Sequence, residues 1–187
     1  TVCTAAGGYL INNIFDKATD EINKPDDVVV GKSISEAMAY NIYMALNIIG
    51  VGAGFYLSNV IGKPGFALLF IVISGTLYLY ASGLKQSLLI GNIIVALLLS
   101  LSIIIIGIFD LLPMIIPQNQ AGMGLLFQIL LDYAIFAFVL NLIREIVKDL
   151  EDVNGDYNQG MNTLPIALGV LRTTRIAFGL SFLAIGF

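Results

Sequence analysis

Apolar residues fill most of the chain, and charged residues interrupt them only at wide intervals. Three uncharged intervals separate four successive charged positions, Glu36, Lys63, Lys85 and Asp110. Each interval is long enough for a helix of about 20 residues, which crosses about 30 Å of hydrocarbon. The pattern returns at about 121–148 and from about 164 onward, and a partial apolar segment precedes Asp16. We therefore predict six membrane-spanning segments.

These spans are predicted to be helices, because a backbone inside lipid must satisfy its own polar groups. The runs lack the strict alternation that a membrane barrel requires. The expected fold is all-α, a polytopic transmembrane helical bundle. Residues 110–120, with Pro113 and Pro117, are predicted to form a loop between two spans. Both chain ends fall inside apolar runs and no basic leader is visible. We therefore expect one domain, 1–187, truncated at both ends.

The composition agrees with a membrane protein and excludes several kinds of functional site. The chain is 58% hydrophobic and 12% charged, whereas soluble domains average about 25% charged residues. A net charge of −4 argues against a nucleic-acid partner. The single cysteine, Cys3, excludes an internal disulfide, and the lack of histidine removes the commonest metal ligand and general base. Nothing in the sequence indicates an oligomeric state.

Most of the charge is concentrated in two stretches. Residues 16–36 hold nine of the 22 charged residues and residues 144–156 hold seven. Four predicted spans separate the stretches, so both are expected on one side of the membrane. That side carries six basic residues, Lys17, Lys24, Lys32, Lys85, Arg144 and Lys148, against Lys63 on the other. The positive-inside rule makes it cytoplasmic.

Acidic residues in both stretches recur at helical spacing. Asn12, Asp16 and Asp20 are four residues apart, which places them within about 80° on one helix face. In the second stretch a similar arc holds five residues, Asn141, Glu145, Asp149, Asp152 and Asp156. Asn154 and Gly155 suggest that the helix frays there, which places Asp156 on the first loop turn.

Carboxylates gathered in this way repel one another unless a cation is present. Oxygen-only ligands indicate Mg²⁺ or Ca²⁺, and Mg²⁺ characteristically bridges carboxylates to substrate phosphates. The predicted metal ligands are Asn12, Asp16, Asp20, Asp149, Asp152 and Asp156. Ammonium groups on the same side are candidates for binding diphosphate: Lys24, Lys32, Lys85 and Lys148. With an apolar pocket behind the diphosphate, the expected substrate is a prenyl diphosphate. Loss of its diphosphate would leave a carbocation, which the faces of aromatic side chains would stabilise.

Three other interpretations compete with this one. In the first, the acidic residues only keep loop ends solvated. A cation-coupled transporter would also use aspartates, but its ionisable groups are expected near the middle of the bilayer. A soluble isoprenoid synthase has aspartate-rich helices, yet those helices carry polar faces that are not seen here.

The motifs resemble those of the UbiA-type membrane prenyltransferase superfamily. N-D-x-x-D-x-x-x-D is matched by Asn12, Asp16 and Asp20, with Asn13 at the first Asp. D-x-x-D-x-x-x-D followed by T-L-P is matched by four elements, Asp149, Asp152, Asp156 and 163–165. A third signature, Y-S/T-x-x-L-K then G-N, appears as Tyr80 to Lys85 followed by Gly91 and Asn92.

The resemblance implies a prenyltransferase that holds two Mg²⁺ ions and a prenyl diphosphate between its aspartate motifs. Catalysis would rest on Asp16, Asp20, Asp152 and Asp156. Substrate binding would add six residues, Asn12, Lys24, Tyr80, Lys85, Asn92 and Lys148. The family plan has nine helices, of which the six predicted spans match the second to the seventh.

Within the superfamily the loop around Lys24 and the helix around Asp149 look most like geranylgeranylglyceryl-phosphate geranylgeranyltransferase and its bacterial relatives. The expected acceptor is then geranylgeranylglyceryl phosphate, with an aromatic quinone precursor as the alternative. Asp27 stands where these relatives usually carry arginine.

Asp132 lies inside a predicted span, where an ionisable group is costly and often functional. It is nine residues from Asn141, about half a turn around the helix, so it is expected to face away from the acidic cluster. We predict a structural role for it.

Overall fold

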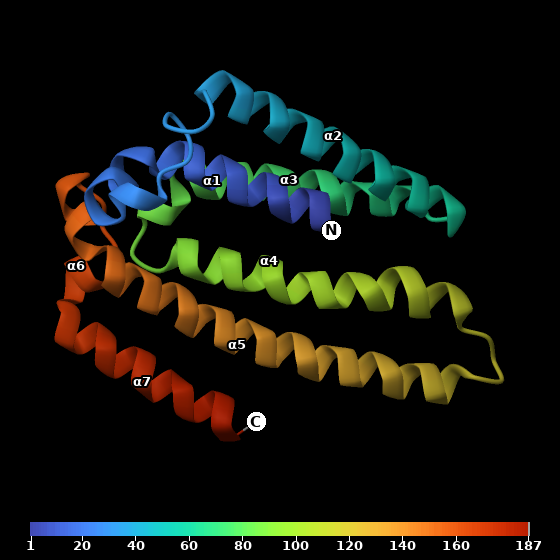
Figure 1. Cartoon of the computed structure of the whole chain (residues 1–187). Helices are drawn as coiled ribbons and strands as arrows, with labels where there is room; N and C mark the ends of the chain where they lie inside the picture. The colour runs from blue at the N-terminus through green and yellow to red at the C-terminus, as the bar shows by residue number, and fades with distance from the viewer. Residues whose placement is uncertain (187) are drawn as a thin grey trace.

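The chain folds into a bundle of long helices (Figure 1). The computed structural model describes residues 1–186, while Phe187 and the side chain of Asp27 lie outside the described residues. Six helices account for most of these residues: α1 (Val2–Asn23), α2 (Glu36–Val60), α3 (Ala67–Ser82), α4 (Ile90–Ile106), α5 (Gln120–Asn158) and α7 (Val170–Gly186). Within residues 1–186 there is no strand, only an isolated bridge between Val30 and Ile34. The prediction of an all-α fold is confirmed.

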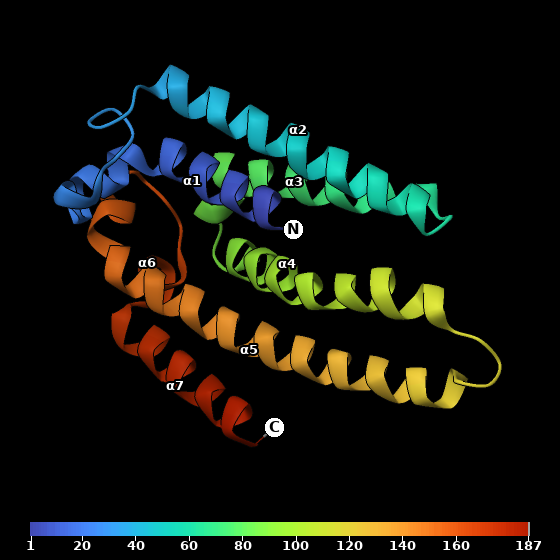
Figure 2. The same ribbon diagram turned by 45° about the vertical axis from the view of Figure 1, so that its right-hand side comes forward.

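The helices form a stack in which neighbours along the chain mostly lie side by side. α1 packs against both α2 and α3, α4 packs against α5, and α7 covers α5 from the other side. Figures 1 and 2 show α2 and α7 at opposite faces of the stack. α1 also contacts α5 directly, and this contact brings together the two acidic stretches.

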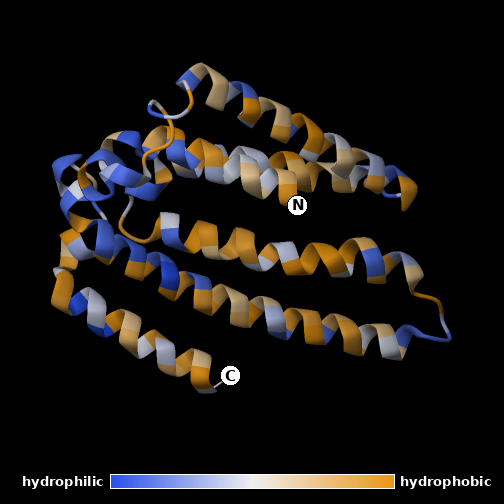
Figure 3. Cartoon of the chain, in the orientation of Figure 1, coloured by the Kyte–Doolittle hydropathy of each residue, from blue (hydrophilic) through white to orange (hydrophobic). Residues whose placement is uncertain are grey.

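Four helical segments are long and apolar enough to cross a membrane, by length and composition: Glu36–Val60, Pro64–Ser82, Ile90–Met114 and Gln120–Asn158. Their outward-facing side chains are largely apolar, as a bilayer requires. Hydrophilic residues gather at the end where α1 and α5 finish, as Figure 3 shows. The bundle is therefore apolar along most of its length and strongly polar at one end.

The first and last predicted spans are helical but do not meet the same criterion. α1 carries four charged residues in its second half, at 16, 17, 20 and 21. The segment from Leu164 is two helices, α6 (Leu164–Leu168) and the 17-residue α7. They are separated by Gly169, whose φ of +85° lies in the left-handed region that glycine tolerates. A continuous span from Leu164 was therefore a wrong prediction.

The predicted loop at residues 110–120 begins later than expected. The α4 helix continues through a π-helical turn, η4 (Gly107–Leu111), and a 3₁₀ turn, η5 (Leu112–Met114). Pro113 sits in the first turn of η5, where its missing N–H costs no hydrogen bond. The expectation that Asp110 lies in a loop was wrong, because it belongs to the π-helical turn.

A folded connection joins α1 to α2 beside the polar end. It contains a 3₁₀ turn, η1 (Pro25–Asp27), and a tight turn at 31–33. Val28 and Val30 of this connection are buried. Lys17 Nζ on α1 lies 3.0 Å from Glu36 Oε1 at the start of α2. These contacts fix the charged end of α1 relative to its neighbour.

Candidate active site

A small polar hollow of about 30 Å³ lies at the hydrophilic end of the bundle. It is lined by side chains from α1, α3, α4 and α5 and from the loops that follow α3 and α5: Asp16, Thr19, Asp20, Tyr80, Lys85, Asn92, Lys148, Asp149, Asp152, Asp156, Met161 and Thr163. Nine of the eleven predicted site residues are in this set. The other two, Asn12 and Lys24, each contact one of its aspartates.

The α1 wall is centred on Asp16. Its carboxylate accepts hydrogen bonds from the Asn12 amide, one helical turn earlier, and from the Lys85 ammonium. Lys85 is carried by the 3₁₀ turn η3 (Leu84–Gln86) that links α3 to α4. The Asp16 and Lys85 side chains are only 13% and 9% exposed, so this ion pair is shielded from solvent screening.

The α5 wall carries three aspartates on one helix face. Asn92 Nδ2 of α4 donates to Asp149 Oδ2 at 2.8 Å. Thr163 Oγ1, in the loop after α5, donates to Asp156 Oδ2 at 3.3 Å. Contrary to the prediction of fraying at Asn154, α5 remains helical to Asn158 and keeps Asp156 in register with Asp152.

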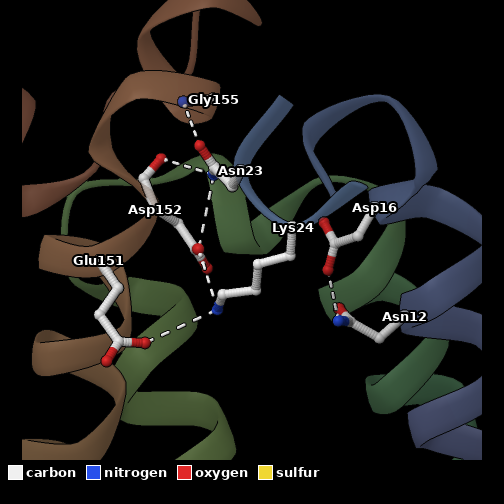
Figure 4. A network of polar contacts seen from close by, with 7 residues as sticks. All are labelled: Asn12, Asp16, Asn23, Lys24, Glu151, Asp152 and Gly155. Carbon is white, nitrogen blue, oxygen red and sulfur yellow. Dashed lines mark hydrogen bonds and ion pairs between the residues drawn. The ribbon is translucent and has the colours of Figure 1, made fainter. Parts of the chain in front are cut away.

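The end of α1 reaches directly to Asp152, as Figure 4 shows. Lys24 Nζ lies 3.3 Å from Asp152 Oδ1 and 3.6 Å from Glu151 Oε2. Asn23 Nδ2 donates to the Asp152 carbonyl oxygen at 3.1 Å. Each acidic wall therefore holds a lysine that comes from another segment of the chain.

Asp20, on α1, interacts electrostatically with charged residues of both walls. Burial raises the pKa of its carboxyl above the usual range, and the Asp16 carboxylate raises this pKa further. The Lys148 ammonium acts in the opposite direction. Burial beside a second carboxylate therefore makes the charged form of Asp20 less favourable, and a cation bound at this place would counter that effect.

Several polar residues near the clusters do not line the hollow. Asn141 Nδ2 donates to the Ala137 carbonyl of its own helix at 2.8 Å, and Arg144 Nη1 lies 2.7 Å from Glu145 Oε1. Lys32 donates to the Pro25 carbonyl.

Asp132 borders a separate, mostly apolar hollow of about 310 Å³ on α5. The expectation that Asp132 stays apart from the acidic cluster is confirmed.

The donor set fits a hard divalent cation shared with a phosphate ligand. Within residues 1–186, no three His, Cys, Asp or Glu side chains converge closely enough to hold a metal ion alone. Mg²⁺ is typically held by one or two carboxylates together with substrate phosphates and water. Facing aspartate walls meet that requirement when a diphosphate lies between them, while the predicted set of six metal ligands stays a prediction.

Sequence reasoning missed four residues at or beside the hollow: Thr19, Asn23, Met161 and Thr163. Thr163 lies within the quoted T-L-P element, so its motif was available as a signal. Asn23 gave none beyond its place in an Asn-Lys-Pro run, since its partners lie 129 and 132 residues away. Only the folded contact between α1 and α5 brings Asn23 to the site.

The sequence model of the UbiA prenyltransferase family matches residues 1–187. The chain belongs to the UbiA prenyltransferase family. Three relatives named digeranylgeranylglyceryl phosphate synthase, each matched over 92% of this chain, are similar to it. Those from Saccharolobus solfataricus and Methanopyrus kandleri are 36% identical over 178 and 172 residues, and that from Sulfolobus acidocaldarius is 38% identical over 175.

The chain spans about half the length of these relatives, 56% in each case. No solved structure matches it significantly. Membership of the UbiA family argues against the transporter and the soluble synthase. Four helices able to cross a membrane, together with membership of this family, indicate a membrane protein.

Proposed function

We propose that this UbiA family member transfers a geranylgeranyl group from its diphosphate to geranylgeranylglyceryl phosphate. One observation carries the proposal: Asp16 and Asp152, which lie on different helices and 136 residues apart, line the same hollow at the polar end of an oily bundle. The names of the relatives support the choice of acceptor, because their product carries two geranylgeranyl groups on glyceryl phosphate.

In this proposal Asp16 and Asp20 on α1 and Asp149, Asp152 and Asp156 on α5 hold Mg²⁺. Asn12 holds Asp16 in position and completes the predicted ligand set. Magnesium, when bound, supplies positive charge that neutralises the diphosphate as it leaves. The oxygen-rich donor set suits this ion.

The lysine side chains at the site are proposed to bind the diphosphate. The hollow of about 30 Å³ holds only a few waters, so we expect a diphosphate to displace the ammonium groups that now contact the aspartates. Lys85 and Lys24 are ion-paired with Asp16 and Asp152. We expect both ammonium groups to turn to diphosphate oxygens, joined by Lys148.

The remaining residues shape the reaction. Asn92 holds Asp149, and the half-buried Tyr80 lines the hollow beside the diphosphate. The allylic C–O bond breaks and diphosphate departs, a hydroxyl oxygen of the acceptor bonds to the prenyl C1, and the hydroxyl proton passes to the released diphosphate. Apolar helices around the tail keep water from the carbocation. We place the site on the cytoplasmic side, within a single UbiA-type domain.

Conservative substitutions in the two walls test the proposal. Asp16→Asn and Asp152→Asn should each lower transfer of a radiolabelled geranylgeranyl group by at least about 100-fold, because both remove charge at the metal-diphosphate site. Chelation of Mg²⁺ should do the same to the unaltered protein. Asp110→Asn, in the π-helical turn outside the hollow, is the matched control. Undiminished transfer by both wall variants, at normal yield of folded protein, would contradict the proposal.

The acceptor requires a separate assay. Membranes containing the protein are supplied with geranylgeranyl diphosphate and either geranylgeranylglyceryl phosphate or an aromatic quinone precursor, and products are identified by mass. We expect product only with the glyceryl phosphate. Product only with the aromatic acceptor would retain the prenyltransferase but overturn the acceptor.

A further inference from the structure

The last residue of α1 is joined to α5 by a single carboxamide that makes three contacts. Asn23 Nδ2 donates to the Asp152 carbonyl oxygen at 3.1 Å and to Asp152 Oδ1 at 3.4 Å. Asn23 Oδ1 accepts from the Gly155 backbone N–H at 3.0 Å. Two of the three partners are backbone groups of α5. The contacts therefore fix the position of the helix itself as well as one carboxylate (Figure 4).

The chemistry of these partners permits only one orientation of the amide. The Gly155 N–H is only a donor, so it must face Oδ1, and the Asp152 carbonyl is only an acceptor, so it must face the NH₂ group. Aspartate at position 23 lacks the donor, and leucine lacks both groups. Asparagine has the required pair of groups at the required length.

Gly155 is the matching feature on α5. A Cβ at position 155 would lie 2.5 Å from Asn23 Nδ2 and 2.8 Å from Thr19 Cγ2. No side chain fits in that space unless Asn23 or Thr19 moves, so glycine at position 155 allows α1 and α5 to approach closely with the Asn23 contacts intact. Gly155 is buried within α5, which continues beyond it to Asn158. Close packing against α1, rather than an end of the helix, therefore explains the glycine at this position.

From these contacts we infer that Asn23 is a positioning residue that sets the spacing between the two aspartate walls. The inference rests on the proposed function, because it assigns a purpose to that spacing. Asp16 and Asp20 lie on α1 just before Asn23, and Asp152 is its direct partner on α5. Lys24 also contacts Asp152, but its side chain is 41% exposed and flexible. Asn23 is the shorter and more rigid link.

The test measures ligand binding rather than turnover. Purified protein in detergent is titrated with Mg²⁺ in the presence of inorganic pyrophosphate, and calorimetry gives both the dissociation constant and the bound fraction. Asn23→Ala should weaken magnesium-pyrophosphate binding about tenfold, as expected when more than one hydrogen bond that orders the site is lost. Asn59→Ala is the control, since Asn59 Nδ2 also donates to a backbone carbonyl, that of Phe55 at 2.7 Å, but on α2.

The two readouts separate positioning from a purely structural role. If Asn23 only stabilises the fold, Asn23→Ala lowers the melting temperature and the bound fraction and leaves the dissociation constant of the folded molecules unchanged. That result overturns the inference. If the unaltered protein binds no magnesium-pyrophosphate at all, the proposed function fails instead, so the two failures are distinguishable.

A second variant tests the same contact from α5. Gly155→Ala should also weaken binding, because its Cβ pushes the Asn23 amide aside. In the double variant the loss should be clearly smaller than the product of the two single losses, since the amide that the Cβ displaces is already gone. If the loss of affinity in the double variant equals the product of the two single losses, Asn23 and Gly155 act independently, and the inference is overturned.

Discussion

At the scale of single residues, the acidic walls are already paired with positive charge from elsewhere in the chain. Lys85 contacts Asp16 and Lys24 contacts Asp152. The first pair is nearly enclosed, and removing one partner of an enclosed ion pair leaves the other charge uncompensated. We interpret these lysines as cations that occupy the carboxylates until metal and diphosphate arrive.

This interpretation predicts effects of opposite sign for one substitution. Lys85→Met should tighten binding of Mg²⁺ alone by roughly tenfold, because Asp16 loses its competing cation. It should weaken binding of magnesium-pyrophosphate, because an ammonium donor to the phosphate is lost. Calorimetric titrations with and without pyrophosphate measure both.

Lys17→Met is the control for Lys85→Met, since Lys17 pairs with Glu36 outside the hollow. The metal-free Lys85→Met protein should also melt at a lower temperature, and Mg²⁺ should restore it. Weaker binding of Mg²⁺ alone in this variant would show that Lys85 does not compete with the metal for Asp16.

At the scale of helices, glycine decides how closely two elements approach. Phe70 of α3 packs on Gly54 of α2, where an added Cβ would lie 2.2 Å from Phe70 Cδ2. Gly52, two residues earlier on α2, has nothing within 4 Å of the same added atom. The two positions differ only in what faces them.

Substituting these two glycines should therefore have different effects on the free energy of unfolding. Gly54→Ala should destabilise the protein by about 1–3 kcal/mol, the usual cost of overpacking. Gly52→Ala should be neutral or stabilising by up to about 1 kcal/mol, because alanine favours the helix. Melting temperatures in detergent measure both, and Phe70→Leu should relieve part of the Gly54→Ala loss. Equal effects at the two positions would show that the Phe70 contact does not matter.

Helices and their glycines also show how far the sequence could be interpreted. The charge-free intervals predicted the apolar helices, and helical spacing predicted which aspartates share a face. Gly155 was interpreted as a helix end when it is a packing site, and the break at Gly169 was not foreseen. Glycine permits both a left-handed turn and a close approach. Only the residues packed against it, Asn23 and Thr19 in the case of Gly155, decide between them.

At the scale of the whole molecule, charge is distributed unequally between the two ends of the bundle. The polar end carries Lys17 on α1, Lys24, Lys32 and Lys85 in the connections, and Arg144 and Lys148 in the second half of α5. The connection between α2 and α3, at the opposite end in Figures 1 and 2, contributes Lys63. Both acidic walls lie at the basic end, as an even number of intervening spans requires. By the positive-inside rule we propose that this end of the bundle faces the cytoplasm.

This orientation predicts which connections a membrane-impermeant reagent reaches. In a Cys3→Ser background, Ser33→Cys places a thiol in the connection at the polar end, and Gln118→Cys places one in the connection between α4 and α5. An impermeant maleimide applied to intact cells should label the protein carrying Gln118→Cys and leave that carrying Ser33→Cys unlabelled, because only the former faces outward. Inside-out vesicles should give the reverse pattern, and detergent-solubilised protein should label at both positions. Labelling of Ser33→Cys in intact cells would place the acidic hollow outside the cell, away from a cytoplasmic supply of prenyl diphosphate, and would contradict the proposed orientation.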